Sequence, residues 1–180
     1  MTTDSATTPI FARIPHPAPT PADARTAVLA NPGFGTQFSD HMVTIDWEEG
    51  ANGVGRWHNA QVGPLLPIPL HPAASVLHYA QEIFEGLKAY RQPDGGLALF
   101  RPQANAARFN ASARRLAMPE LPEDLFLEAI RQLLTVDRDW LPTVDGGSLY
   151  LRPFMIATEA FLGVRPAKQY KFIVIASPAG

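Results

Sequence analysis

The chain has 180 residues, of which 46% are hydrophobic and 18% charged, and its formal net charge is −2. This length supports one domain with a sizeable core, and the weak negative charge argues against a nucleic-acid partner. The absence of cysteine excludes disulfides, thiolate metal sites and a cysteine nucleophile. We expect no membrane segment, because the longest apolar run, residues 172–176, is far shorter than the roughly 20 residues of a spanning helix. Residues 1–9 do not resemble a secretory signal, so a cytoplasmic protein is expected.

Residues 1–35 are predicted to form an irregular N-terminal arm. Prolines stand at positions 9, 15, 17, 19, 21 and 32. Each proline lacks a backbone N–H and restricts the residue before it, so this density opposes regular structure. The arm ends in an Asn-Pro-Gly-Phe-Gly turn that carries one aromatic ring, Phe34. The domain proper is expected over residues 36–176.

Residues 41–46 and 56–62 are predicted to be paired strands, joined by a turn in the glycine-rich segment 50–55. The same glycines raise the alternative of a phosphate-binding loop. Their spacing is not GxGxxG and no strong helix follows, so the turn is the favoured interpretation.

The next segment is predicted to be helical, because Val76, Leu77, Ala80 and Ile83 recur at helical spacing and Gly86 suits the position after a helix end. The remaining predicted elements are a hairpin of residues 87–91 and 97–100, a helix over about 102–116, a helix after residue 122, and strands over 149–158 and 170–176. Strands and helices mix without strict βαβ alternation. This favours an α+β fold with a largely antiparallel sheet and packed helices.

The first candidate site is a group of arginines in the predicted helix 102–116. Arg108 and Arg115 are seven residues apart and share a helix face, with Ser112 between them. A guanidinium fork suits a phosphate. The alternative is a solvated basic face with surface ion pairs, and from the residues alone this alternative is favoured.

The second candidate lies on the strand 149–158, where Tyr150 and Arg152 share an otherwise apolar face. A partly buried arginine on such a face needs a carboxylate partner. That partner is either a substrate or an internal residue, for which Glu159 and Glu85 are the candidates.

Other side chains have two interpretations each. Tyr79 and Phe84 suit either a pocket wall or the core, and Lys88 is either a nucleophilic amine or a solvated lysine. Asp137 and Asp139 raise the question of a metal pair, but they point in different directions at a helix end. No metal site is expected.

Six short motifs occur in order between residues 34 and 180. They are FSDHM at 38–42, LHYAQEIFEGLKAY at 77–90, FRP at 100–102 with Asn105 and Arg108, VDRDW at 136–140, LYLRP at 149–153 and LGVRP at 162–166. Together they resemble the signature of the branched-chain amino acid aminotransferases, which are pyridoxal-phosphate enzymes of fold type IV. The resemblance implies a small N-terminal α/β domain, a larger C-terminal domain and the cofactor, pyridoxal 5′-phosphate, between them.

The resemblance also implies roles for individual residues. Arg108 matches the arginine that holds the cofactor phosphate. The residues that match the substrate pocket are Phe34, Tyr79, Phe84, Gly86, Tyr150 and Arg152. A loop that reaches the other subunit of a homodimer is matched by Leu162, Gly163 and Val164. The implied partners are amino acids and 2-oxo acids.

One departure from the family pattern concerns the Schiff-base lysine. None of the three lysines, at positions 88, 168 and 171, matches it, and residues 177–180 resemble the start of the linker that precedes the large domain. The expected function is therefore transamination of leucine, isoleucine or valine with 2-oxoglutarate, in a protein of which this chain is the N-terminal half, inactive alone. The alternatives are another type IV enzyme, a D-amino acid aminotransferase or an aminodeoxychorismate lyase, and a non-catalytic folding or dimerisation module.

Overall fold

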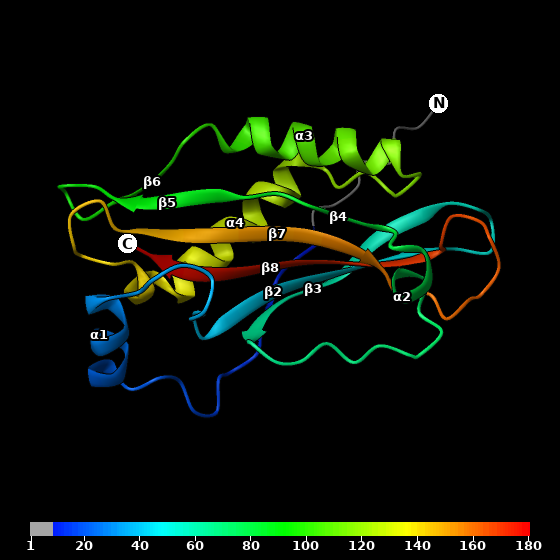
Figure 1. Ribbon diagram of the computed structural model, residues 1–180. Helices are drawn as coiled ribbons and strands as arrows, with labels where there is room; N and C mark the ends of the chain where they lie inside the picture. Colours follow the sequence, from blue (N-terminus) through cyan, green and yellow to red (C-terminus); the bar gives the residue numbers. More distant parts are fainter. Residues whose placement is uncertain (1–8) are drawn as a thin grey trace.

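An eight-stranded sheet organises the part of the chain that the computed structural model describes, residues 9–180 (Figure 1). Its order is β1-β3-β2-β8-β7-β5-β6, with β4 also paired to β7. The strands are β1 (Ala12–Arg13), β2 (His41–Glu49), β3 (Gly55–Pro64), β4 (Glu82–Phe84), β5 (Leu87–Arg91), β6 (Leu97–Leu99), β7 (Ser148–Ala157) and β8 (Gln169–Ala179). Every pair is antiparallel except β1 with β3. The predicted α+β class is confirmed.

The helices are α1 (Ala22–Ala30), α2 (Ser75–Tyr79), α3 (Pro102–Arg115), α4 (Glu123–Val136) and a short 3₁₀ turn, Arg138–Trp140. Helices α3 and α4 pack on the same face of the sheet (Figure 1). Phe109 of α3, Phe126 of α4 and Phe172 of β8 meet there, with ring centroids 5.5–5.9 Å apart. Strand β8 lies between β2 and β7 and is mostly buried, as its apolar sequence predicts.

Alternation along β7 separates the core from the opposite face of the sheet. Leu149, Leu151 and Met155 are fully buried, whereas Tyr150 and Arg152 are only half-buried. Because side chains alternate across a strand, the two sets point to opposite faces. The β7–β8 register runs from Ser148↔Ala179 to Ala157↔Tyr170 without a shift, so this division holds along the whole strand.

The helix predicted over residues 76–83 is wrong beyond its first turn. Helix α2 ends at Tyr79, because Ala80 adopts a left-handed conformation with φ of 49°. Residues 82–84 then form β4 along β7, where Ile83 is buried between two exposed neighbours. Leu77, one of the apolar residues on which the helical prediction rests, is 59% exposed. Gly86 accordingly follows a strand and does not end a helix.

The irregular arm predicted for residues 1–35 is also corrected, for the part that lies within residues 9–180. No proline interrupts residues 22–31, and alanine, the best helix former, occupies four of the nine positions of α1. Thr20, just before this helix, donates a hydrogen bond from its hydroxyl to Asp40, with oxygen atoms 2.5 Å apart. Residues 1–8 lie outside the described part, and the domain boundaries at 35 and 176 remain predictions, with β8 continuing through residue 179.

Candidate functional site

Arg152 stands at the centre of the half-buried face of β7. Its Nε and Nη2 donate hydrogen bonds to the Tyr150 hydroxyl, at 3.1 and 2.8 Å, and its guanidinium lies 4.5 Å from the centre of the Phe84 ring. The predicted internal partners are occupied elsewhere, Glu85 by Arg108 and Glu159 by Arg165. Within residues 9–180 Arg152 therefore has aromatic neighbours and no ion pair, and the internal-salt-bridge alternative is wrong.

Two predicted residues, Phe34 and Gly86, lie against the Tyr150 side chain, and a third, Phe84, lies against Arg152. The Phe34 ring meets the Tyr150 ring edge-on, with centroids 5.2 Å apart. A Cβ atom on Gly86 would lie 2.5 Å from the Tyr150 hydroxyl oxygen, so only glycine leaves room for the tyrosine here. Phe84, 64% exposed, is paired in register with Phe154 of β7. Together these residues form an open aromatic wall with one cation in it.

Arg108 stands on α3 and is joined to this wall by Glu85, which lies between β4 and β5. Its Nε and Nη2 donate hydrogen bonds to the two carboxylate oxygens of Glu85, at 2.5 and 2.7 Å. Asn105 Nδ2 donates both to Glu85, at 2.9 Å, and to the Gly86 carbonyl, at 3.2 Å. Burial alone would raise the pKa of the Glu85 carboxyl, but the hydrogen bonds from Arg108 and Asn105 outweigh burial and hold this pKa below its ordinary value.

Two hollows adjoin Arg108. One, of about 380 Å³, lies against Gly86, Lys88 and Asn105, and the other, of about 490 Å³, lies against Phe84 and Arg115. Arg108 and Arg115 therefore line the same hollow, which confirms the shared helix face predicted from their spacing. The geometry leaves the Arg108 guanidinium accessible from two sides.

Tyr79 and the 162–164 loop form a separate cluster at the Ala157 end of β7, away from Tyr150 (Figure 1). The Tyr79 hydroxyl donates a hydrogen bond to the Leu162 carbonyl. A Cβ on Gly163 would overlap the ring of Phe161, and Val164 is 91% exposed at the loop tip. Tyr79 thus supports the loop, and the described chain does not bring it to the Arg152 wall.

Most of the remaining sequence candidates have structural roles. Lys168 pairs with Glu49, at 2.7 Å, and Lys171 with Asp46, whereas Lys88 lies exposed on β5 beside Tyr150. Asp137 is buried and accepts hydrogen bonds from the backbone N–H and ring Nδ1 of His41, at 3.0 and 2.6 Å. Residues 9–180 contain no cluster of three or more metal-ligating side chains, and none of their helices is long and apolar enough to span a membrane.

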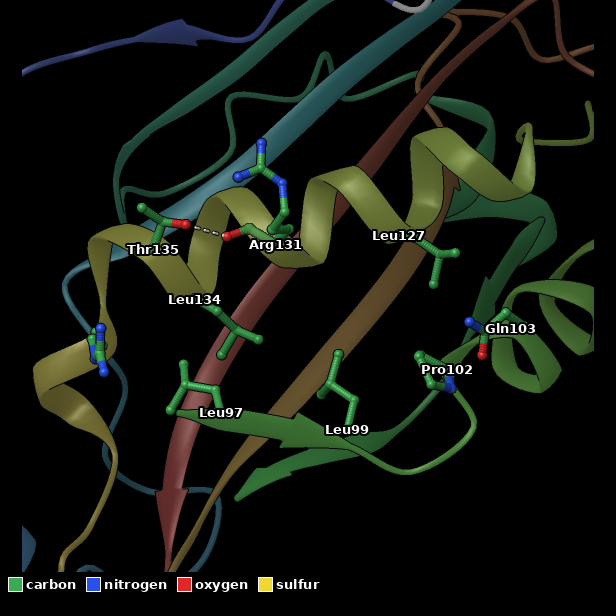
Figure 2. Close-up of a pocket in the computed structure, with 9 residues that line it drawn as sticks. Leu97, Leu99, Pro102, Gln103, Leu127, Arg131, Leu134 and Thr135 are labelled. Atoms are coloured by element: carbon green, nitrogen blue, oxygen red, sulfur yellow. Dashed lines mark hydrogen bonds between the residues drawn. The ribbon is translucent and has the colours of Figure 1, made fainter. Parts of the chain in front are cut away.

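A further groove, of about 470 Å³, lies between β6, α3 and α4 (Figure 2). Leucine side chains from β6 and α4 line it, and Arg131 stands on α4 with its carbonyl accepting a hydrogen bond from Thr135. None of the predicted site residues lines this groove. The candidate site is therefore the wall around Arg152 together with Arg108.

Sequence reasoning missed the part that Glu85 and Asn105 play in joining the two halves of this site. Both residues stand in the motifs, but Glu85 was considered only as a partner for Arg152. One signal could have found this pair. A buried acidic residue needs a cation, and Arg108 stands in the next helix along the chain and in a neighbouring motif.

Comparison with known proteins identifies relatives of the whole chain, although no protein-family model matches it. A Streptomyces coelicolor protein named "Probable branched-chain-amino-acid aminotransferase" is 61% identical over 175 residues, which are 97% of this chain and 47% of the relative. The branched-chain-amino-acid aminotransferase of Mycolicibacterium smegmatis is also 61% identical, over 87% of this chain and 42% of its own length. The chain thus spans less than half the length of these curated relatives.

Solved structures agree on the fold. A branched-chain amino acid aminotransferase from T.th., in complex with N-(5′-phosphopyridoxyl)-L-glutamate, superposes with a TM-score of 0.55 and 26% identity, over 74% of this chain and 40% of that one. The Escherichia coli branched-chain enzyme gives a TM-score of 0.58 at 24% identity, over 78% and 40%, and supports the fold alone. The fold class expected from the motifs, that of the small domain of these enzymes, is confirmed.

Proposed function

We propose that this chain, which is related in sequence and fold to the branched-chain amino acid aminotransferases, provides one wall of a pyridoxal-phosphate-dependent aminotransferase site. The complete protein would transfer the amino group of leucine, isoleucine or valine to 2-oxoglutarate. The chain alone would be inactive, because none of its three lysines matches the Schiff-base lysine of the family.

The observation that carries the proposal is the environment of Arg152. A pocket for both half-reactions must accept an apolar branched side chain and, in turn, the side-chain carboxylate of glutamate. Phe34, Phe84 and Tyr150 offer apolar contact, and Arg152 offers a cation that no carboxylate within residues 9–180 neutralises. Such a wall suits either substrate, because the charge-assisted pair forms only when the second carboxylate is present.

Arg108 fits the phosphate of the cofactor. A guanidinium has five N–H donors, and Glu85 accepts two of those of Arg108, which leaves three on an accessible side chain. These three donors form a fork of the kind that binds phosphate oxygens in pairs.

The residues of this chain would bind and orient rather than transfer protons. When bound, pyridoxal phosphate supplies an electron sink for the carbanion that remains after the amino acid loses its α-proton. Arg108 would anchor the phosphate end, and Gly86 would leave room for the Tyr150 side chain in the wall that the substrate meets. Tyr150 would fix the Arg152 guanidinium through its hydroxyl, and the aromatic rings would exclude water from the substrate side chain.

A homodimer is part of the proposal. Leu162 and Val164 are 61% and 91% exposed at the tip of a loop that Tyr79 and the Glu159–Arg165 pair hold in place. An exposed apolar tip on a supported loop suits contact with a second subunit. The cytoplasmic location expected from the sequence remains a prediction.

The test is an assay of the full-length protein whose sequence includes this chain. With pyridoxal phosphate present, we expect leucine, isoleucine and valine to transfer their amino groups to 2-oxoglutarate, and D-alanine to be inert. Turnover of D-alanine, or release of 4-aminobenzoate from aminodeoxychorismate, would favour the other type IV enzymes. The absence of turnover with any of these substrates would favour the alternative that the chain is a non-catalytic folding or dimerisation module.

A further inference from the structure

Glu85 is a buried carboxylate at the junction of β4 and β5, and its side chain is 5% exposed. Besides the bonds from Arg108 and Asn105, it accepts one from the Gly86 N–H at 3.3 Å. A buried charge is costly unless it is paired and hydrogen-bonded. Here every hydrogen bond to the carboxylate is donated by a residue of the candidate site, so Glu85 is stabilised only when these residues are in place.

The pair leaves the two partners in different environments, because the Arg108 side chain is 66% exposed. Glu85 accepts the Nε–H and one Nη2–H, which lie on the same side of the guanidinium. The two N–H groups of Nη1 and the second N–H of Nη2 have no hydrogen-bond partner within residues 9–180. They form the end of the guanidinium that faces outward, which is the part able to hold an anion.

We propose that Glu85 is a positioning residue, which fixes the Arg108 guanidinium so that its free end binds the cofactor phosphate. This inference rests on the phosphate-binding role proposed for Arg108. A long, exposed arginine without such a partner would sample many rotamers and lose more entropy on binding. Asn105 extends the arrangement, because it ties the same carboxylate to the Gly86 carbonyl and so to the wall around Tyr150.

Glu85 has two opposing effects on phosphate binding, so its replacement could either tighten or weaken the binding. A carboxylate near a phosphate repels it, so removal of the charge alone would tighten phosphate binding. Removal of the hydrogen-bonded support would weaken the binding, because Arg108 loses its fixed orientation. Since the Glu85 charge is already neutralised by a bidentate pair, we expect the loss of support to dominate.

The experiment compares dissociation constants of the full-length apoprotein for pyridoxal phosphate and for pyridoxal, which lacks the phosphate. We expect Glu85→Gln to raise the Kd for pyridoxal phosphate about tenfold and to change the Kd for pyridoxal less than twofold. Glu120→Gln is the control, because Glu120 pairs at 2.5 Å with Arg114, which stands on the same helix as Arg108. It should change neither constant.

A double-mutant cycle separates positioning from general stability. In an Arg108→Met background, Glu85→Gln should have no further effect on the Kd for pyridoxal phosphate. Three results for Glu85→Gln would overturn the positioning role: an equal rise of the Kd for pyridoxal phosphate and for pyridoxal, an unchanged Kd for pyridoxal phosphate, or a lower Kd for pyridoxal phosphate. If Arg108→Met itself leaves pyridoxal phosphate binding unchanged, the proposed phosphate role of Arg108 fails, independently of Glu85.

Arg108→Lys covers the case in which Glu85→Gln does not fold. A lysine keeps a positive charge opposite Glu85 but has no planar fork, so it tests orientation with the buried carboxylate still paired. Weakening of pyridoxal phosphate binding of about tenfold, with pyridoxal unaffected, supports the proposal. Wild-type binding of pyridoxal phosphate by this variant overturns it, because charge alone would then suffice.

Discussion

Replacement of Arg152 by methionine in the full-length protein tests the proposal that one pocket accepts two kinds of substrate. Methionine roughly keeps the volume of the side chain but removes its charge. Of the five guanidinium N–H donors, the Tyr150 hydroxyl accepts two in the structure, so three remain for a substrate carboxylate. We therefore expect the kcat/KM for glutamate to fall about 10²-fold, the scale of a partly desolvated charge pair.

For leucine the same variant should lose less than about threefold in kcat/KM, because an apolar side chain forms no ion pair with Arg152. The effect on stability follows from the contacts that disappear. A cation–π contact with Phe84 contributes about 0.5–1 kcal/mol and the bonds to Tyr150 about 1 kcal/mol. The total, about 2 kcal/mol at most, is smaller than the roughly 3–5 kcal/mol for a broken buried ion pair.

The assay is stopped-flow measurement of each half-reaction separately, with a melting curve of the same preparation. Tyr150→Phe is a matched control, because it removes the hydroxyl that receives the two Arg152 bonds but keeps both the ring and the charge. Its loss with glutamate should be smaller than that of Arg152→Met. Equal losses of Arg152→Met for glutamate and leucine, with a strongly lowered melting temperature, would refute the substrate-carboxylate role.

Three other predictions concern the site and its support. Gly86→Ala should lower kcat/KM for both substrates about tenfold or more, because the new Cβ would displace Tyr150, and unchanged kinetics would contradict this packing. Asp40→Asn should destabilise the protein by about 1 kcal/mol near pH 7. Burial would raise the pKa of Asp40, but hydrogen bonds from Thr20 and Trp140 hold it below its ordinary value of 3.8. The ionised carboxylate therefore stabilises the folded state fully above pH 3.8, and this stabilisation is lost as the pH falls further. The free energies of unfolding of variant and wild type, measured with denaturant, should converge in acid. Borohydride reduction of the 180-residue chain mixed with pyridoxal phosphate should leave no stoichiometric adduct. An adduct mapped to Lys88, together with transaminase turnover, would contradict the prediction that none of the three lysines forms the Schiff base.

Local patterns predicted the strands β2, β3, β5, β6, β7 and β8 and the helices α3 and α4, because their signals are strong. The segment after residue 122 places apolar side chains on one helix face and acidic residues in its first turn, and α4 forms there. Residues 50–55 concentrate glycine between two segments of strand-forming residues, and β2 and β3 pair across them. In each case the local preference and the buried surface agree.

The segment 76–84 could not be predicted in the same way, because its apolar spacing fits a helix and a strand equally well. What decides is distant in the sequence: β7 provides hydrogen-bond partners for residues 82–84, and Ile83 fills the core only from a strand. The joining of Arg108 to Glu85 across the β4–β5 connection depends on this strand. The motifs therefore indicate which residues form the candidate site, and the tertiary pairing determines which of them touch.

The uninterrupted pairing of β7 with β8 constrains how this protein can vary. Tyr150 and Arg152 lie near one end of β7, and the Tyr79–Leu162 cluster lies at the other. The core leucines, Leu149 and Leu151, alternate with Tyr150 and Arg152 along the strand. A residue inserted or deleted just before Tyr150 would invert the side chains that follow it, turning Tyr150 and Arg152 towards the hydrophobic interior and Leu151 outward. The pairing of β2 with β3, by contrast, shifts register between Thr44 and Asp46, where β3 carries one extra residue. We expect natural variants to accept substitutions along β7 but to keep its number of residues constant.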